Sequence, residues 1–318
     1  MVSLTTITSD FTIYSFFIIL IIGTIGNICN LIAFLSKDLR TKACIFYMVC
    51  SASLDLFFSN FGIIIRFATE YFGNNLVNTN RGICKVRGYL LVCLPAMAST
   101  GVLLATFDRC VSTSPNARWR RLSSIWFAQR LFIIFMLFIL ISSSFHLIVY
   151  DIRNGTCAPS PGLAAIIVAL YIILSFLIPN AGMIICGIMT RRHLQQSKNR
   201  IVPISLTNNN QQLGVERTNR QLLILIFTQA SVSTVLLSQR CLTYSYLVIT
   251  SSVQKSVEQQ QIEYFIQQVS LILMYGNYGM TFFINYCSSR MFRKTFRASI
   301  QSLMNRYFRF CKCGQMQN

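Results

Sequence analysis

The chain has 318 residues, of which 53% are hydrophobic and only 12% are charged. About a quarter of the residues of a typical soluble domain are charged, so this composition excludes an ordinary water-soluble globule. The net charge of +19 would suggest nucleic acid as the partner of a soluble protein, but these basic residues sort by side of a membrane rather than into one patch. We therefore predict an all-α membrane protein without a nucleic-acid partner.

Seven runs with little or no charge are long enough to cross a bilayer as helices. The predicted spans are residues 11–36, 43–69, 84–110, 127–150, 162–190, 220–249 and 264–289. Residues 1–10 are polar and lack the features of a cleaved signal peptide, so we expect a short extracellular N-terminus. Residues 290–318 begin with alternating basic and apolar side chains, a pattern typical of an amphipathic helix on the membrane surface.

The distribution of lysine and arginine predicts the orientation of this seven-helix bundle. With the N-terminus outside, 21 of the 28 basic residues lie on the cytoplasmic side and seven lie outside. Cytoplasmic segments carry the excess of positive charge in membrane proteins. The C-terminus and the basic segment from 191 to 220, which reads as a flexible loop, are therefore expected in the cytoplasm of a multi-pass plasma-membrane protein.

The third span has chemically different ends. Cys84 precedes an uncharged run of 20 residues, and Asp108-Arg109-Cys110 follows it. By this topology Cys84 and Cys157 both lie on the oxidising side, where a disulfide would join the third span to the second extracellular loop; the alternative is two free thiols. Asn154 begins an Asn-Gly-Thr glycosylation acceptor in the same loop.

Short motifs on the predicted spans occur in a fixed order. They are Gly26-Asn27 on the first span, Ser53-Leu54-Asp55-Leu56 on the second, Asp108-Arg109-Cys110 on the third, Pro179 on the fifth and Phe292-Arg293 after the seventh. In this order the chain resembles the rhodopsin-like, or class A, G-protein-coupled receptors over nearly its whole length. The resemblance implies a receptor that binds an extracellular ligand between its helices and activates a heterotrimeric G protein.

The resemblance assigns G-protein coupling to Asp108, Arg109 and Cys110. It implies that Arg109 pairs with Asp108 at rest and meets the G protein when the inner ends of the helices part. The plainer alternative is an arginine that reaches the membrane interface from a helix end. The chain departs from the family pattern because Cys110 replaces a tyrosine and because the sixth span has no Trp-x-Pro switch, with Gln239 near the position of the proline.

Asp55 is the only acidic residue deep inside a predicted span. An ionised carboxylate there is costly unless it is paired or hydrated. Asn27 and Asn277 are candidate neighbours, and the family resemblance implies a sodium site in which Thr281 stands at the seventh-span position. We expect that site to be weakened or absent, and the alternative is a protonated Asp55 that is hydrogen-bonded within the bundle.

The ligand is less clearly encoded than the fold. The third span has no aspartate above its centre, so the usual anchor of an amine ligand is missing. Arg87 and Arg240, with Asp151, Glu258 and Glu263, are the charged pocket candidates, and together they favour a short peptide. In the tail, Cys311 and Cys313 beside the basic segment are candidates for palmitoylation, with free cysteines as the alternative.

Other classes of membrane protein fit less well. The chain has two histidines, on opposite sides by this topology, so neither a multi-histidine metal site nor an enzyme is expected. The seventh span has no lysine for a retinal Schiff base, and no cofactor is predicted. A seven-span transporter or a non-signalling membrane protein is the remaining alternative to a receptor.

Overall fold

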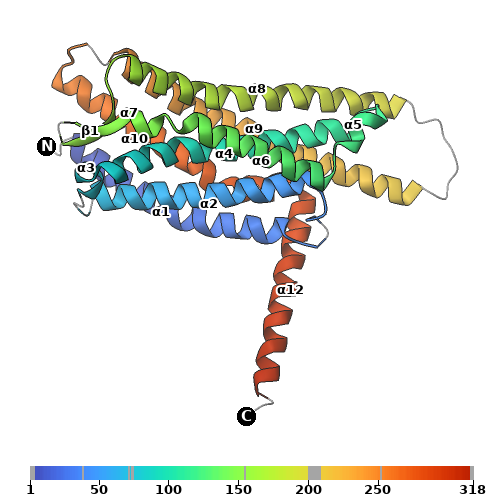
Figure 1. Cartoon of the computed structure of the whole chain (residues 1–318). Coiled ribbons are helices and arrows are strands. Elements are labelled where there is room, and N and C mark those ends of the chain that lie inside the picture. Colours follow the sequence, from blue (N-terminus) through green and yellow to red (C-terminus); the bar gives the residue numbers. More distant parts are fainter. Residues whose placement is uncertain are drawn as a thin grey trace.

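The computed structural model describes residues 4–37, 39–70, 72, 75–153, 155–199, 209–250 and 253–315. Within them the chain is helical apart from short connections and one β-hairpin (Figure 1). The helices are α1 Leu4–Phe34, α2 Ala43–Glu70, α3 Leu76–Thr79, α4 Arg81–Ser112, α5 Ala117–Arg121, α6 Ile125–Ser143, α7 His146–Val149, α8 Leu163–Asn199, α9 Asn209–Ile249, α10 Val257–Gly279, α11 Thr281–Ser288 and α12 Arg290–Gln315. The strands are β1 Tyr150–Arg153 and β2 Thr156–Pro159.

Six helical stretches of the described chain are long and apolar enough to cross a membrane: those built on α1, α2, α4, α6 with α7, α8 and α9. Large apolar side chains such as Phe138, Ile141 and Ile178 are exposed on their outer faces, as expected for helices surrounded by lipid. The predicted seventh span corresponds to α10 and α11. It is interrupted at Met280, and α10 begins with a glutamate- and glutamine-rich segment that lowers its hydropathy.

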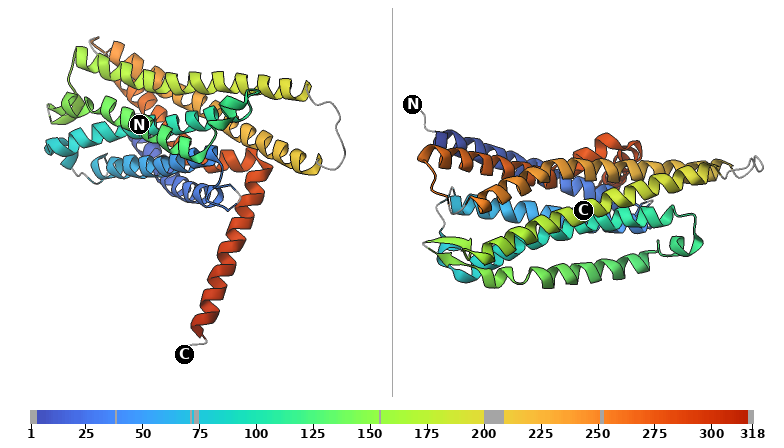
Figure 2. Two further views of the ribbon diagram at one scale, coloured as in Figure 1. Left: turned by 45° about the vertical axis from the view of Figure 1, so that its right-hand side comes forward. Right: turned by 90° about the horizontal axis from the view of Figure 1, so that it is seen from above.

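The helices form one bundle with α4 at its centre. Helix α4 contacts α2, α6, α8 and α9, and 61% of its most apolar window is buried, against 22% in α6 and in α8. Cys84 at one end of the predicted third span, and Asp108 and Arg109 at the other, are all buried. The further views in Figure 2 show the same side-by-side arrangement of the long helices.

Helices α1 and α10 touch backbone to backbone. A Cβ atom added to Gly23 would lie 3.0 Å from the Cα atom of Gly279, and Gly26 faces the same helix. Small residues allow such close approach between membrane helices. Asn27, beside this contact, donates a hydrogen bond to the backbone oxygen of Tyr278 at 3.1 Å.

Helix α12 leaves the bundle crosswise (Figure 1). Its anchor is Phe292, which is fully buried with its ring 5.4 Å from that of Phe34 and 5.9 Å from that of Phe282. Arg293 caps α11 by donating to the backbone oxygens of Tyr286 and Cys287. The side chains of Cys311 and Cys313 lie outside the described residues.

Helix α1 begins at Leu4, before the predicted start of the first span at residue 11. The expectation of a flexible loop from 191 to 220 requires correction. Helices α8 and α9 extend to Asn199 and from Asn209, into the segment expected to be a flexible loop. Glutamine, lysine and arginine there have high helix propensity, which continues each helix beyond its apolar part.

Candidate functional site

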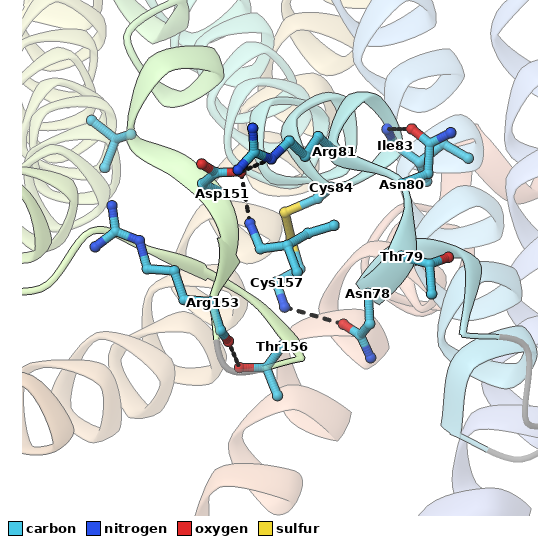
Figure 3. Close-up of a disulfide and its surroundings, with 12 residues drawn as sticks. Asn78, Thr79, Asn80, Arg81, Ile83, Cys84, Asp151, Arg153, Thr156 and Cys157 are labelled. Carbon is cyan, nitrogen blue, oxygen red and sulfur yellow. Dashed lines mark hydrogen bonds and ion pairs between the residues drawn. A yellow bond between two sulfur atoms is a disulfide. The ribbon is translucent and has the colours of Figure 1, made fainter.

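One end of the bundle, here called the disulfide end, is fixed by a covalent bond. Cys84, in the first turn of α4, is bonded to Cys157 of β2, with Cα atoms 5.6 Å apart (Figure 3). The backbone N–H of Cys157 also donates to Oδ1 of Asn78 at 3.1 Å. The predicted disulfide is confirmed, and it holds the β-hairpin against the start of α4.

The hairpin itself was not predicted, although an Asn-Gly pair is a strong signal for one. Gly155 has a φ of +73°, a conformation that favours glycine, between β1 and β2. Asp151 of β1 pairs with Arg81 of α4 at 3.2 Å, so the hairpin is joined to α4 at a second point (Figure 3). Asn154, the candidate glycosylation site, lies outside the described residues.

A cavity of about 290 Å³ opens below this hairpin, and we call it the arginine cavity. Three half-buried arginines from three helices line it: Arg66 of α2, Arg87 of α4 and Arg240 of α9. Arg87 lies one turn after Cys84, so the disulfide fixes the part of α4 that carries it. The remaining lining is largely apolar and aromatic, and includes Leu91, Phe176, Leu271, Met274 and Tyr275.

Two of these arginines, Arg87 and Arg240, lie near tyrosines. The guanidinium of Arg240 lies 5.5 Å from the ring centre of Tyr244 and donates to Oγ of Ser270 at 3.4 Å. Arg87 and Arg240 both lie within electrostatic range of the phenol of Tyr150, which also lines the cavity. The three positive charges therefore converge on one space.

Glycines make room for two of these tyrosines. A Cβ atom at Gly62 would collide with the hydroxyl of Tyr275, and a Cβ atom at Gly88 would lie 2.7 Å from the ring of Tyr150. Any larger residue would push these rings from their places, so the shape of the cavity depends on both glycines.

The acidic pocket candidates do not join the two predicted arginines. Asp151 is paired with Arg81. Glu263 lies 2.6 Å from Nζ of Lys255, which lowers the pKa of Glu263, and accepts a hydrogen bond from Tyr246. Glu258 lies with Glu263 in a separate surface depression between α9 and α10. Sequence reasoning identified the acids as the outer charges, but the short-range pairs that use two of them depend on how the helices pack.

A smaller polar cavity lies next to the arginine cavity, and Ser99, Leu237 and Tyr278 line both. Its volume of about 30 Å³ is enough for roughly one water molecule. Three of the four residues proposed from the sequence, Asp55, Asn277 and Thr281, line it, while Asn27 lies outside and contacts the backbone of Tyr278.

The surroundings of Asp55 are rich in acceptors. Thr281 lines the same cavity as Asp55, and its hydroxyl donates to the backbone oxygen of Asn277 at 3.4 Å. Oδ1 of Asn277 and Oε1 of Gln229, in the same cavity, are buried and accept no hydrogen bond from the described residues. A protonated Asp55 could donate one hydrogen bond within this group of oxygens, and a bound ion or water molecule could interact with the others.

We expect a protonated Asp55 and therefore little effect of the change Asp55→Asn. An amide N–H can replace the carboxyl O–H as a donor, so stability should change by less than about 1 kcal/mol, whereas Asp55→Leu should cost about 1–3 kcal/mol by leaving buried acceptors unsatisfied. The measurement is thermal unfolding of the purified protein with sodium or potassium chloride. A sodium-dependent rise of the wild-type midpoint that Asp55→Asn abolishes would contradict this prediction and indicate an ion site.

The opposite end of the bundle, the Arg109 end, contains a buried ion pair. Nη2 of Arg109 lies 2.7 Å from Oδ2 of Asp108, and the two residues are 6% and 5% exposed. Oδ1 of Asp108 accepts a hydrogen bond from Ser123 at 2.7 Å, which was not predicted. Cys110 is buried next to Cys186 and Thr190 of α8. The predicted pairing of Asp108 with Arg109 is therefore present.

A comparison with known families identifies a matching family. The family described as serpentine-type 7TM GPCR chemoreceptor Srsx matches residues 20–300, from within α1 to within α12. The chain belongs to the Srsx family. A comparison with curated proteins found no match.

Membership in the Srsx family identifies a G-protein-coupled receptor and a multi-pass membrane protein, and not an enzyme. It implies a G protein and an extracellular ligand as partners in general terms. The expected rhodopsin-like resemblance holds at the level of G-protein-coupled receptors; the family shown is a chemoreceptor family, and it specifies no peptide ligand.

A contact at the Arg109 end joins two helices of this Srsx receptor. Oε1 of Gln221, near the start of the apolar part of α9, accepts hydrogen bonds from Oγ of Ser289 at 3.1 Å and from the backbone N–H of Met291 at 3.0 Å. It therefore holds α9 against the junction of α11 and α12. Sequence reasoning missed this residue because a glutamine at a helix start has no distinctive pattern.

We expect Gln221→Leu to raise basal signalling. Loss of the two hydrogen bonds, at about 1 kcal/mol net, should favour separation of α9 from α11 by about fivefold. Basal GTP exchange on a G protein in reconstituted membranes measures this. Gln196→Leu, an exposed change on α8, is the matched control, and equal basal rates in the two variants would contradict the prediction.

Proposed function

We propose that the chain is a plasma-membrane chemoreceptor that binds an extracellular ligand in the arginine cavity and activates a heterotrimeric G protein at the Arg109 end. In this proposal α10 and α11 together form the seventh crossing, the N-terminus lies outside and α12 lies on the cytoplasmic leaflet. The excess of basic residues at the Arg109 end supports this orientation.

One observation supports the proposal most strongly. Helix α4 contributes Arg87 and Leu91 to the arginine cavity, Ser99 to the smaller polar cavity that Asp55 lines, and the buried Asp108–Arg109 pair to the opposite end. A ligand in the first cavity would therefore contact the same rigid helix that carries the coupling residues. Two distant sites are coupled when both favour the same one of two conformations of a structural element that they share.

GTP exchange on purified heterotrimeric G proteins tests the proposal, with the full-length receptor in lipid nanodiscs and a library of small chemicals and short peptides. We expect at least one compound to accelerate exchange, and Ala96→Phe, which fills part of the arginine cavity, to abolish its effect. Uptake of the same compounds into receptor-containing vesicles without any exchange would instead indicate a transporter.

Further features of the receptor follow from this orientation. The hairpin would face the extracellular side, where glycosylation of Asn154 is possible, and acylation of Cys311 or Cys313 would anchor the end of α12. A peptide ligand would need acidic receptor groups for any basic residues it carries, but Asp151 and Glu263 are already paired.

A further inference from the structure

We propose that the arginine cavity selects an organic anion, with a carboxylate bound by the arginines and an apolar or aromatic body packed in the remaining space. This rests on the proposed function, because it assigns the ligand class of that receptor site.

The charged residues that line the cavity are all positive. Arg66, Arg87 and Arg240 line the cavity, and among its described lining residues none is aspartate or glutamate. Arg240 lies within electrostatic range of Arg66, and Arg87 and Arg240 both act on Tyr150. An anion bound in this partly dry space would be attracted by all three guanidinium groups.

The chemistry of these side chains favours a planar acceptor. A guanidinium group presents N–H donors in a rigid fork that matches the two oxygens of a carboxylate. Arg240 places its guanidinium against the ring of Tyr244, and its described hydrogen bond, to Ser270, is 3.4 Å long. A ligand carboxylate would therefore replace a weak contact with a stronger one.

The walls define the rest of the ligand. Leu91, Phe176, Leu271 and Met274 provide apolar surface, and Tyr275 adds an aromatic face. The volume of about 290 Å³ lies near the lower end of ligand pockets. These features favour a small molecule with one charged end over a multiply charged or fully polar compound.

Two sources share this chemistry: a free organic acid and the C-terminal carboxylate of a short apolar peptide. The probes are therefore octanoate and phenylpropionate, each beside its primary amide, and an apolar tripeptide with a free or amidated C-terminus. Inorganic phosphate tests whether charge alone is sufficient. Binding is measured as the shift of the thermal unfolding midpoint of the full-length receptor in nanodiscs, as a function of probe concentration.

We expect at least one carboxylate to raise the wild-type midpoint while its amide does not. Arg240→Gln and Arg87→Gln should each weaken that binding by about 10- to 100-fold, as expected for loss of a charged hydrogen-bonding partner. Arg240→Lys, which keeps the charge but loses the fork, should weaken it less. Arg153→Gln, an exposed change at the same end of the bundle, is the matched control and should bind as the wild type does.

The proposal is wrong if every amide shifts the midpoint as much as its acid, if no carboxylate produces a shift, or if phosphate alone matches the organic acids. It is also wrong if the glutamine variants fold and bind carboxylates with wild-type affinity. If Arg240→Gln does not fold, Arg87→Gln and Arg240→Lys provide the same test. Carboxylate binding without GTP exchange would leave this inference intact and contradict the proposed function. GTP exchange stimulated only by uncharged compounds would contradict this inference and leave the proposed function intact.

Discussion

Replacement of Arg109 by alanine is expected to abolish G-protein activation while ligand binding persists. Arg109 is buried at rest against Asp108, 2.7 Å away, at the end of α4 that faces the cytoplasm in the proposed orientation. If its guanidinium turns to the G protein in the active state, its removal eliminates several charged hydrogen bonds at the centre of an interface. We expect the rate of ligand-stimulated GTP exchange to fall by about 100-fold or more.

The buried partner complicates this test and also supplies its control. Without Arg109, the carboxylate of Asp108 keeps only the Ser123 contact among its described hydrogen bonds, and an uncompensated buried charge costs about 3–5 kcal/mol. The double variant Asp108→Asn with Arg109→Ala avoids that cost. Arg118→Ala, an exposed change on α5, is the matched control. Wild-type GTP exchange by the folded double variant would show that Arg109 only reaches the membrane interface.

Loss of the disulfide is expected to have the largest effect on stability. The bond between Cys84 and Cys157 closes a loop with a sequence separation of 73, for which the chain-entropy model gives about 4 kcal/mol. We expect Cys84→Ser and Cys157→Ser each to lower the thermal unfolding midpoint by on the order of 10 °C. Both should also weaken ligand binding, because Arg87 lies one turn from Cys84 and Tyr150 begins the hairpin.

A double-mutant comparison separates the bond from the two side chains. If the bond is the cause, the double serine variant should be no less stable than either single variant. A mild reductant should reproduce the effect in the wild type. Cys287→Ser removes an exposed free cysteine and should change neither the midpoint nor binding. Additive losses in the double variant would assign the effect to packing of the individual side chains.

Features carried by spacing along one helix could be predicted from the sequence. Cys84 and Arg109 lie 25 residues apart on α4, so their positions at opposite ends follow from helix geometry alone. Asp55 could be placed because one acid in an apolar run must be buried with polar neighbours, and two of its three predicted neighbours, Asn277 and Thr281, share its cavity.

Features that depend on packing between helices could not be predicted in the same way. The sequence predicted Asp151 and Glu263 as charged groups of the outer face, but their pairing with Arg81 and Lys255 depends on the hairpin and on the start of α10. Arg66 was taken only as the end of the second span. The sequence places Arg66 near the outer end of its span, at a level in the membrane similar to that of Arg87. That Arg66 lines the same cavity as Arg240 depends on how α2 and α9 pack in the bundle.

The choice of arginine for the three cavity cations has a consequence for the conditions under which such a receptor works. A guanidinium group keeps its charge at any pH that a cell meets, unlike histidine. The charge of the arginine cavity is therefore constant while the acidity of the surroundings changes. A weak organic acid loses its own charge as the medium becomes more acidic, so the occupancy of the cavity would follow the ionised fraction of the compound rather than its total concentration. The protonation state of the ligand itself would then set the range of environments in which it is detected.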